Sequence, residues 1–128
     1  MSTTTFASLG VPAPIVATLE RRGITTPFPI QVATIADALA GRDLSGKAPT
    51  GSGKTLAFGI PMAARVTRSA PKKPHGLVLA PTRELAIQVA TELEQLTSDL
   101  RVLAVYGGAG IEPQMKRLRA GVDIVVAT

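Results

Sequence analysis

The spacing of apolar residues divides the chain into five helical and three extended segments. Apolar residues recur every three or four positions along the helical segments, which is typical of helices with one buried face. The predicted helices span 12–22, 29–40, 54–66, 82–96 and 112–120. Three short runs are apolar almost throughout, as expected of strands buried in a parallel sheet. These predicted strands span 76–81, 101–108 and 122–128.

Three of the predicted helices carry well-defined apolar stripes. The residues that form these stripes are Ile15, Val16 and Leu19; Val32, Ile35, Ala36 and Leu39; and Leu85, Val89, Leu93 and Leu96. Proline and glycine set the boundaries, because proline suits a first helical turn and glycine suits a helix end. Pro61 falls inside the helix at 54–66 and is predicted to kink or shorten it.

The order of these elements predicts the fold class. Apolar strands that alternate with helices are typical of crossover units, in which the strands form a parallel sheet and helices cover both faces. The sequence therefore predicts an α/β fold with helices on both faces of a parallel sheet.

Composition narrows the class of protein. The 128 residues suffice for one domain and include no cysteine, so neither disulfides nor thiol metal sites are expected. No apolar run reaches the roughly 20 residues that cross a bilayer, and the first residues do not resemble a secretory signal, so we expect no membrane partner and a cytoplasmic location. The net charge of +5 fits either a polyanionic partner or a basic protein without one.

The stretch APTGSGKT at 48–55 has the composition of a phosphate-binding loop that opens a helix. Gly51 and Gly53 permit backbone conformations that turn N–H groups toward an anion, and Lys54 offers a positive charge to terminal phosphates. The Thr55 hydroxyl is suited to ligate Mg²⁺. The general loop pattern asks for glycine where Ala48 stands. A glycine-rich turn that caps an unrelated helix is the structural alternative.

Several other residues each have both a functional and a structural interpretation. The Gln31 amide matches N6 and N7 of adenine, but a glutamine at a helix start also occurs without function. Thr82 fits a helix start as a capping residue, whereas Arg83 is unfavourable there unless an anion lies nearby. Gly107 and Gly108 either direct amides at a phosphate or simply form the turn after a strand.

Several stretches, taken together and in order, resemble the motifs of the DEAD-box RNA helicases. The matching stretches are GITTPFPIQ at 23–31, APTGSGKT at 48–55, PTRELA at 81–86, YGG at 106–108 and DIVVAT at 123–128. Ala48 is the residue that this family usually carries at that position. The resemblance covers nearly the whole chain.

This resemblance implies an incomplete RecA-like P-loop domain over residues 1–128. Residues 1–42 would form the region of the adenine-reading Q motif, and residues 43–128 would run from the phosphate loop to the start of a T-P-G-R-type motif. The cofactors would be ATP and Mg²⁺, with Thr55 as the metal ligand. The residues implied in nucleotide binding are Phe6, Ile24, Gln31, Ala48, Pro49, Thr50, Gly51, Ser52, Gly53, Lys54 and Thr55.

The resemblance also implies contacts with the RNA sugar-phosphate backbone, independent of base sequence. The residues implied are Pro81, Thr82, Arg83, Gly107, Gly108 and Thr128. One position departs from the family, because Ile24 stands where an aromatic residue commonly packs on the base, so base affinity is expected to be lower than is typical.

The resemblance further implies a fragment, because the D-E-A-D and S-A-T motifs and a second RecA-like domain would lie beyond Thr128. No complete catalytic set is therefore expected. Asp123 lies at the start of its strand, on the wrong edge of a parallel sheet to take part. We expect nucleotide binding without hydrolysis or strand separation by the chain alone.

The segment DLSGKA at 43–48 is assigned as the strand before the phosphate loop, although its residues favour strands poorly. Without its family neighbours we expect unpaired backbone there, and a fragment that is either marginally stable or prone to self-association. Two other functions remain open. One is a non-enzymatic module that binds nucleotide and RNA, and the other is a different P-loop enzyme such as a small kinase, which leaves 23–31 and 81–86 unexplained.

Overall fold

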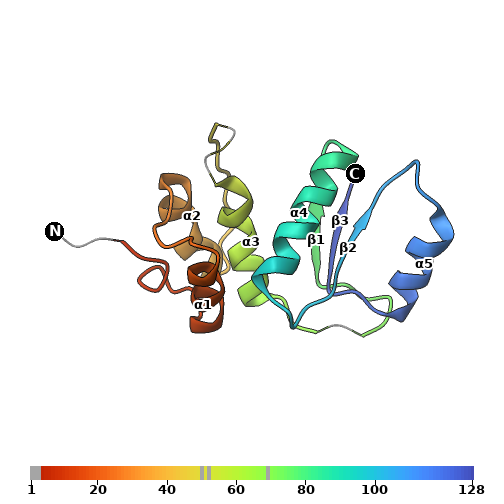
Figure 1. The fold of residues 1–128 in the computed structure, drawn as a ribbon, viewed down its shortest axis with the longest axis horizontal. Coiled ribbons are helices and arrows are strands. Elements are labelled where there is room, and N and C mark those ends of the chain that lie inside the picture. Colours follow the sequence, from red (N-terminus) through yellow and green to blue (C-terminus); the bar gives the residue numbers. More distant parts are fainter. Residues whose placement is uncertain (1–3, 50, 52, 69) are drawn as a thin grey trace. The chain divides into compact units, whose positions relative to one another are not determined.

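The computed structural model describes residues 4–49, 51, 53–68 and 70–128 (Figure 1). The chain forms two compact units, Met1–Arg65 and Val66–Thr128. The predicted helices and the three predicted apolar strands are all present in the predicted order. Their bounds agree with the prediction to within three residues, so the periodicity of the sequence identified these elements correctly.

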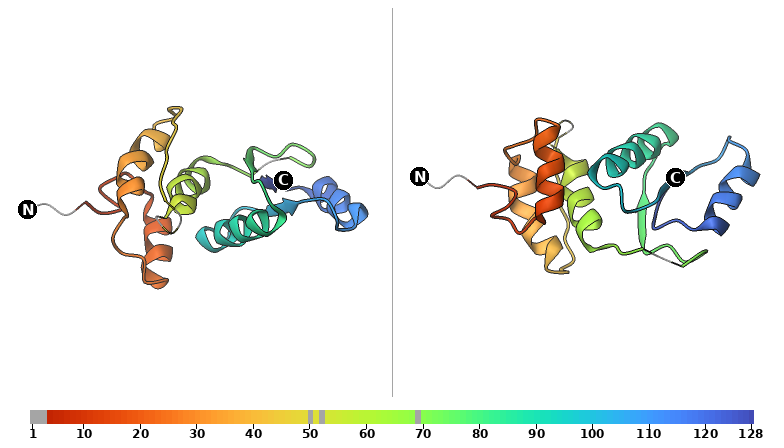
Figure 2. Two further views of the ribbon diagram at one scale, coloured as in Figure 1. Left: turned by 90° about the horizontal axis from the view of Figure 1, so that it is seen from above. Right: turned by 60° about the horizontal axis from the view of Figure 1, so that its bottom comes forward.

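Three helices make up the first unit: α1 (Ala13–Arg21), α2 (Pro29–Leu39) and α3 (Lys54–Arg65). Both views in Figure 2 show α2 and α3 packed side by side. The apolar side chains that this unit buries are Phe6, Val11, Ile15, Leu19, Ile35, Ala57 and Ile60.

The buried face of α2 differs from its predicted stripe. Ile35 is fully buried, but Val32 and Ala36 are exposed, and the second buried residue is Gln31. Gln31 and Ile35 are four positions apart and so share one face of the helix. A polar side chain is tolerated inside because both ends of its amide have hydrogen-bond partners.

Pro61 does not shorten α3, which continues to Arg65. A proline inside a helix removes one backbone hydrogen bond. Gly59, Ile60 and Pro61 are all buried, and this burial helps to offset the lost bond. Of the two predicted effects, the shortening is wrong and the kink stays a prediction.

The segment 43–49 forms no strand, contrary to the prediction. It runs along α2 instead, since a Cβ added to Gly46 would lie 3.3 Å from Ile30 Cδ1 and 3.7 Å from Thr34 Cγ2. Ser45, Gly46 and Lys47 favour strands poorly, and the three described strands pair only with one another.

The second unit is built around a parallel sheet. Its elements are β1 (Gly76–Leu79), α4 (Arg83–Leu96), β2 (Val102–Val105), α5 (Ile111–Ala120) and β3 (Ile124–Ala127). The strand order is β1-β3-β2, with Ile124 opposite both Gly76 and Val102. The predicted α/β fold with a parallel sheet is thus confirmed.

Helix α5 begins at Ile111, one residue before the predicted start, and Pro113 is tolerated in its first turn because N–H groups there need no partner within the helix.

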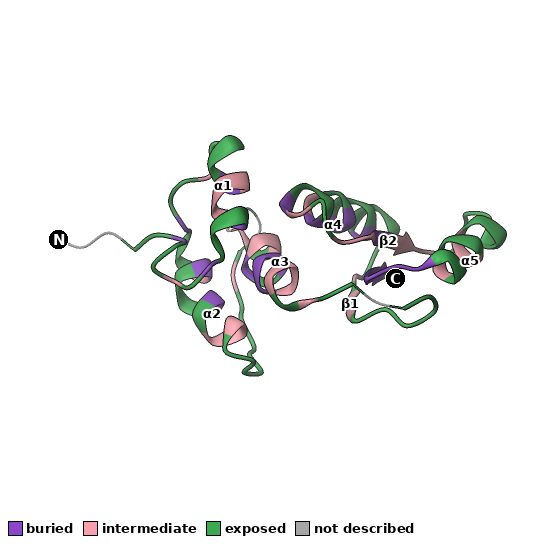
Figure 3. Ribbon diagram, turned by 90° about the horizontal axis from the view of Figure 1, so that it is seen from below, coloured by how far each residue is buried: buried purple, intermediate pink, exposed green. Residues whose placement is uncertain are grey.

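Helices cover β2 and β3 more fully than β1. Helix α4 packs on β2 and β3 through a face that includes Val89, Leu93 and Leu96, as predicted, together with Ala86 and Ala90, whereas Leu85 is exposed (Figure 3). Leu118 of α5 packs against the buried cluster formed by Leu103, Val122 and Val125. In β1, by contrast, Leu77 and Leu79 are 63% and 74% exposed. The expected cover on both faces therefore holds only over part of the sheet.

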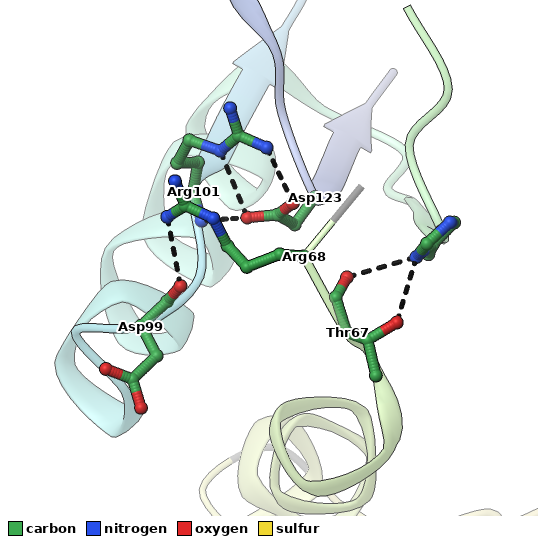
Figure 4. Close-up of polar contacts among 6 residues, drawn as sticks. Thr67, Arg68, Asp99, Arg101 and Asp123 are labelled. Carbon is green, nitrogen blue, oxygen red and sulfur yellow. Dashed lines mark hydrogen bonds and ion pairs between the residues drawn. The ribbon is translucent and has the colours of Figure 1, made fainter. Parts of the chain in front are cut away.

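A buried carboxylate fixes the amino-terminal edge of this sheet (Figure 4). Asp123 is fully buried, and its carboxylate accepts hydrogen bonds from the Arg101 backbone N–H at 2.7 Å and from Nη2 at 2.9 Å. The hydrogen bond to Asp123 raises the pKa of Arg101. Gly121, at φ 119°, leaves the space that this guanidinium occupies, because a Cβ there would collide with it. Asp123 thus joins the starts of β2 and β3.

The Asp123→Asn substitution should destabilise β2 and β3. The amide cannot accept all three hydrogen bonds from Arg101, and it leaves that cation without its charged partner. The free energy of the opening that exposes the strand amides to hydrogen exchange should fall by about 2 kcal/mol. Asp99→Asn is the matched control, since Asp99 is exposed. Unchanged protection in Asp123→Asn would contradict the anchoring role.

Candidate nucleotide and nucleic-acid sites

The predicted phosphate loop connects the segment beside α2 to the start of α3. Thr50 and Ser52 lie outside the described residues, whereas Ala48, Pro49, Gly51 and Gly53 lie within them. Gly51 and Gly53 have φ angles of 83° and 82°. Residues that carry a side chain rarely adopt this left-handed backbone conformation, so the loop needs glycine at both positions.

Lys54 and Thr55 form the first turn of α3. The Lys54 side chain is exposed and Thr55 is half-buried. The first N–H groups of any helix have no acceptor within the helix, and the helix dipole makes this end partially positive. Together with the lysine cation, the start of α3 therefore has the chemistry of a phosphate-binding site.

Gln31 contacts this loop directly. Its Nε2 donates to the Gly53 carbonyl at 3.0 Å, and its Oε1 accepts from the Phe28 N–H at 2.8 Å. The side chain is only 2% exposed. The structure thus brings the predicted base-reading residue and the predicted phosphate loop together, with both ends of the Gln31 amide engaged by the protein itself.

The other two residues implied in base binding have different surroundings. Phe6 is 2% exposed and belongs to the core of the first unit, where its carbonyl accepts from the Val11 N–H. Ile24 is half-buried, and its N–H donates to the Leu19 carbonyl at 2.9 Å. Phe6 is therefore part of the packing of the first unit, whereas Ile24 retains some exposed surface.

The second candidate site lies at the carboxyl-terminal edge of the sheet. Parallel strands end at the same edge, which is where ligands of open α/β sheets bind. Ala80, just after β1, donates its N–H to Ala127 at 2.8 Å, and the Thr128 N–H donates to Val105 of β2 at 3.2 Å. The segments that follow the three strands, 80–83, 106–108 and 128, are therefore neighbours along this edge.

The start of α4 carries the predicted contact residues on this edge. Thr82 caps the helix, because its side chain accepts a hydrogen bond from the Leu85 N–H at 3.2 Å. The Arg83 side chain is half exposed and extends toward the glycine pair, since a Cβ added to Gly108 would lie 3.2 Å from Nη1. Position 108 also requires glycine, because its φ is 84°. A half-exposed guanidinium, whose Nε lies 3.8 Å from Glu84 Oε1, and an exposed glycine turn thus lie side by side.

Gln114 is a residue that the sequence analysis did not identify. Its side chain accepts from the Tyr106 N–H and donates to the Tyr106 and Gly110 carbonyls, each at 3.2 Å. These bonds close the turn that contains Gly107 and Gly108. No local signal marks such a residue, because Tyr106 lies eight positions before it and the two meet only across the folded turn.

Acidic residues do not gather at either site within the described part of the chain. Among the described residues no cluster of three or more histidine, cysteine or acidic side chains could hold a metal ion. Asp123 lies before β3, at the amino-terminal edge, as the sequence predicted, and it is paired with Arg101. In the same described residues every helix is too short or too polar to span a bilayer.

Comparisons with known proteins identify the relatives of this chain. The sequence model of the DEAD/DEAH box helicase family matches residues 28–128. The chain is 52% identical to DEAD-box ATP-dependent RNA helicase 3B, chloroplastic, of Zea mays, over 95% of this chain and 17% of that protein. It is 47% identical to ATP-dependent RNA helicase DeaD of Escherichia coli, over 98% of this chain and 20% of that protein. The chain thus spans a fifth or less of the length of these two relatives.

Solved structures with the same fold come from the same group of proteins. A DEAD box protein from Methanococcus jannaschii matches with a TM-score of 0.89 at 37% identity, over 97% of this chain and 34% of that one. The RNA helicase Prp28 of Chaetomium thermophilum, solved bound to ADP, matches with a TM-score of 0.86 at 39% identity, over the whole of this chain and 32% of that one. The fold is therefore that of the RecA-like domain of such helicases, of which this chain forms an incomplete part.

The Gln114→Ala substitution should loosen the turn at 107–110 without unfolding the sheet. Gln114 accepts a hydrogen bond from the Tyr106 N–H, so the loss of that bond should raise exchange of the Tyr106 amide about fivefold, because one net hydrogen bond is worth about 1 kcal/mol. Gln95→Ala, on the exposed side of α4, is the control. If the Tyr106 amide exchanges alike in both variants, Gln114 does not hold the turn.

Proposed function

The chain belongs to the DEAD/DEAH box helicase family, and from this membership we propose that it supplies the ATP-binding and RNA-backbone-binding functions of an ATP-dependent RNA helicase. Such a protein couples ATP binding and hydrolysis to the separation or remodelling of RNA strands. The observation that carries the proposal is the positive-φ glycine loop at the start of α3, joined to Gln31 by a hydrogen bond.

The first unit has the features that an adenine nucleotide requires. Amides at the start of α3 and the Lys54 cation would bind the phosphates. The Gln31 amide would recognise adenine through the second N–H and the second oxygen lone pair that its bonds to Gly53 and Phe28 do not use. The Thr55 hydroxyl would be one ligand of Mg²⁺, which would neutralise phosphate charge when bound. The lower base affinity expected from Ile24 stays a prediction.

The second unit offers contacts of the kind that bind a sugar-phosphate backbone. Arg83 supplies a charge, and the turn at Gly107 and Gly108 supplies backbone amides, beside Pro81, Thr82 and Thr128. Groups of this kind bind phosphates and sugars and do not distinguish bases. The RNA contacts are therefore proposed to be independent of base sequence.

Hydrolysis is not proposed for the 128-residue chain by itself. Positioning of the attacking water requires a group beside the terminal phosphate, and Asp123 points into its ion pair at the opposite edge of the sheet. The expected absence of turnover and the expected self-association stay predictions. So does the cytoplasmic location, since the maize relative is named as chloroplastic.

The Lys54→Ala substitution should weaken ADP binding by the chain. Removal of a charged hydrogen-bond donor to phosphate is worth roughly 1.5–3 kcal/mol, or about a ten- to hundredfold increase in Kd. Titration with fluorescent ADP measures this increase. Lys73→Ala removes the same charge from an exposed loop of the second unit and should leave the Kd unchanged.

The same titration with fluorescent GDP tests the proposed recognition of adenine. The unmodified chain should bind ADP more tightly than GDP, because the Gln31 amide matches only adenine with both a donor and an acceptor. Equal affinities for the two nucleotides would refute this part of the proposal.

The Arg83→Ala substitution should lower RNA affinity by the same factor for unrelated single-stranded sequences. It should also reduce the slope of the logarithm of affinity against the logarithm of salt concentration by roughly one, because one phosphate contact is lost. Fluorescence anisotropy over a range of salt concentrations measures both quantities. Lys116→Ala, which removes an exposed charge from α5, is the comparison. A sequence-dependent loss would show that Arg83 contacts bases instead.

A further inference from the structure

The two edges of the sheet in the second unit differ in charge. The segments that follow the three strands, 80–83, 106–108 and 128, contain one cation, Arg83. The segments that precede the strands, together with the last turn of α5, contain six cations and two acidic residues. These are Arg68, Lys72, Lys73, Arg101, Arg117 and Arg119, and Asp99 and Asp123. Positive charge is therefore concentrated at the edge opposite the candidate RNA-contact residues.

Four of these cations gather at the end of α5 (Figure 1). Arg117 and Arg119 lie in its last turn. The loop that carries Lys72 and Lys73 lies against that turn, because the Lys72 N–H donates to the Leu118 carbonyl at 3.3 Å. All four residues are exposed. We refer to these four cations as the α5-end patch.

The requirements of α5 itself account for only part of this charge. The helix dipole favours cations near a helix end, which explains the two arginines. Two of the last carbonyls of α5 already accept from backbone N–H groups, those of Lys72 and Gly121. No acidic residue stands in 66–75 or in 113–122, so nothing within these segments offsets the repulsion among the four cations.

Lys72 has a backbone conformation that is unusual for lysine. Its φ is 64°, and it is the one non-glycine residue with a positive φ in the part of the chain that the structure describes. It is the third residue of a turn that begins at Ala70, since the Lys73 N–H donates to the Ala70 carbonyl at 3.2 Å. When proline is the second residue of a turn and the third has a positive φ, that third residue is usually glycine or asparagine. Lysine thus occupies a position where glycine would cost less free energy, and such strained residues cluster at functional sites.

The chemistry of the α5-end patch favours the phosphates of a double-stranded nucleic acid. Its cations, on flexible stems, bind phosphates and do not distinguish bases. Surfaces that bind single strands usually add aromatic side chains on which bases stack, and the one aromatic residue of the second unit, Tyr106, follows β2 at the other edge. A protein partner would need an apolar centre to its interface. No large apolar side chain among the described residues of 66–75 and 113–122 is exposed.

We propose that the α5-end patch binds the phosphates of double-stranded RNA. This assignment rests on the proposed RNA binding and adds to it a second surface, separate from the edge at Arg83. Each of the three strands has four residues, which places the two edges of the sheet roughly 13 Å apart. One RNA molecule can therefore contact both edges, with a single strand at the carboxyl-terminal edge and an adjoining duplex at the α5-end patch.

Fluorescence anisotropy with a blunt-ended RNA duplex, at several salt concentrations, tests this surface. Lys72→Gly and Arg119→Gln should each reduce the slope of the logarithm of affinity against the logarithm of salt concentration by about one, and the double variant by about two, because each cation contacts one phosphate. Lys72→Gly also relieves the unfavourable backbone conformation, so a loss of binding in this variant would not be due to unfolding. Lys116→Ala is the matched control, since Glu112 stands four positions before Lys116 and offsets its charge.

One strand of the same duplex, used alone, separates the α5-end patch from Arg83. The patch variants should leave the affinity for this single strand unchanged, whereas Arg83→Ala should lower it. If the patch variants bind the duplex as the unmodified chain does, or weaken both RNAs to the same extent, the assignment to duplex RNA is wrong. If polyglutamate displaces the duplex as readily as unlabelled duplex does, the patch fits an acidic protein and the assignment is also overturned. If the patch variants lose duplex binding but Arg83→Ala leaves single-strand binding unchanged, this surface stands and the proposed contact at Arg83 fails.

Discussion

The second unit depends on the parallel pairing of its central strand. β3 pairs with β1 on one side and with β2 on the other, and all three strands run in the same direction. Parallel pairing needs a crossover helix between successive strands, which accounts for α4 and α5. It also brings every strand end to one edge. Arg83, Gly108 and Thr128 are far apart in the chain, and they become neighbours only because three strands end together.

The two edges of this sheet differ in burial and charge. The amino-terminal edge is closed by Asp123, which is buried and bonded to both the backbone and the side chain of Arg101. An ion pair with one fully buried partner is costly to break, so this edge is suited to stability. The carboxyl-terminal edge has an exposed guanidinium, a glycine turn and a capped helix start. The half-exposed Arg83 side chain and the exposed turn at Gly107 and Gly108 are accessible to an external anion.

In the first unit the corresponding constraint is the backbone of Gly53. Its φ of 82° excludes most side chains, and the Phe28 ring and the Gln31 amide occupy the space that a Cβ would need. Its carbonyl completes the first turn of α3 and binds α2 at the same time. One peptide group therefore connects the packing of two helices to the conformation of the loop. This explains why a polar residue, Gln31, occupies a core position of α2.

Local sequence determined the elements, and tertiary contacts decided how their faces are used. Periodicity located the five helices and the three apolar strands, and glycine at 51 and 53 marked the loop, because these signals depend on neighbouring residues alone. Periodicity does not show which side chains of a helix are buried when the element that packs against the helix is unknown. Val32 and Ala36 of α2 are exposed and Gln31 is inside, since α3 and the loop supply partners for its amide.

The segment 43–49, assigned as a strand for its place in the motif order, lies along α2, because no strand pairs with it among the described residues. The contact of Gln31 with Gly53, the turn held by Gln114 and the pair of Asp123 with Arg101 join residues 8 to 22 positions apart. Only the folded chain brings such residues within hydrogen-bond distance, so only the tertiary structure could identify these contacts.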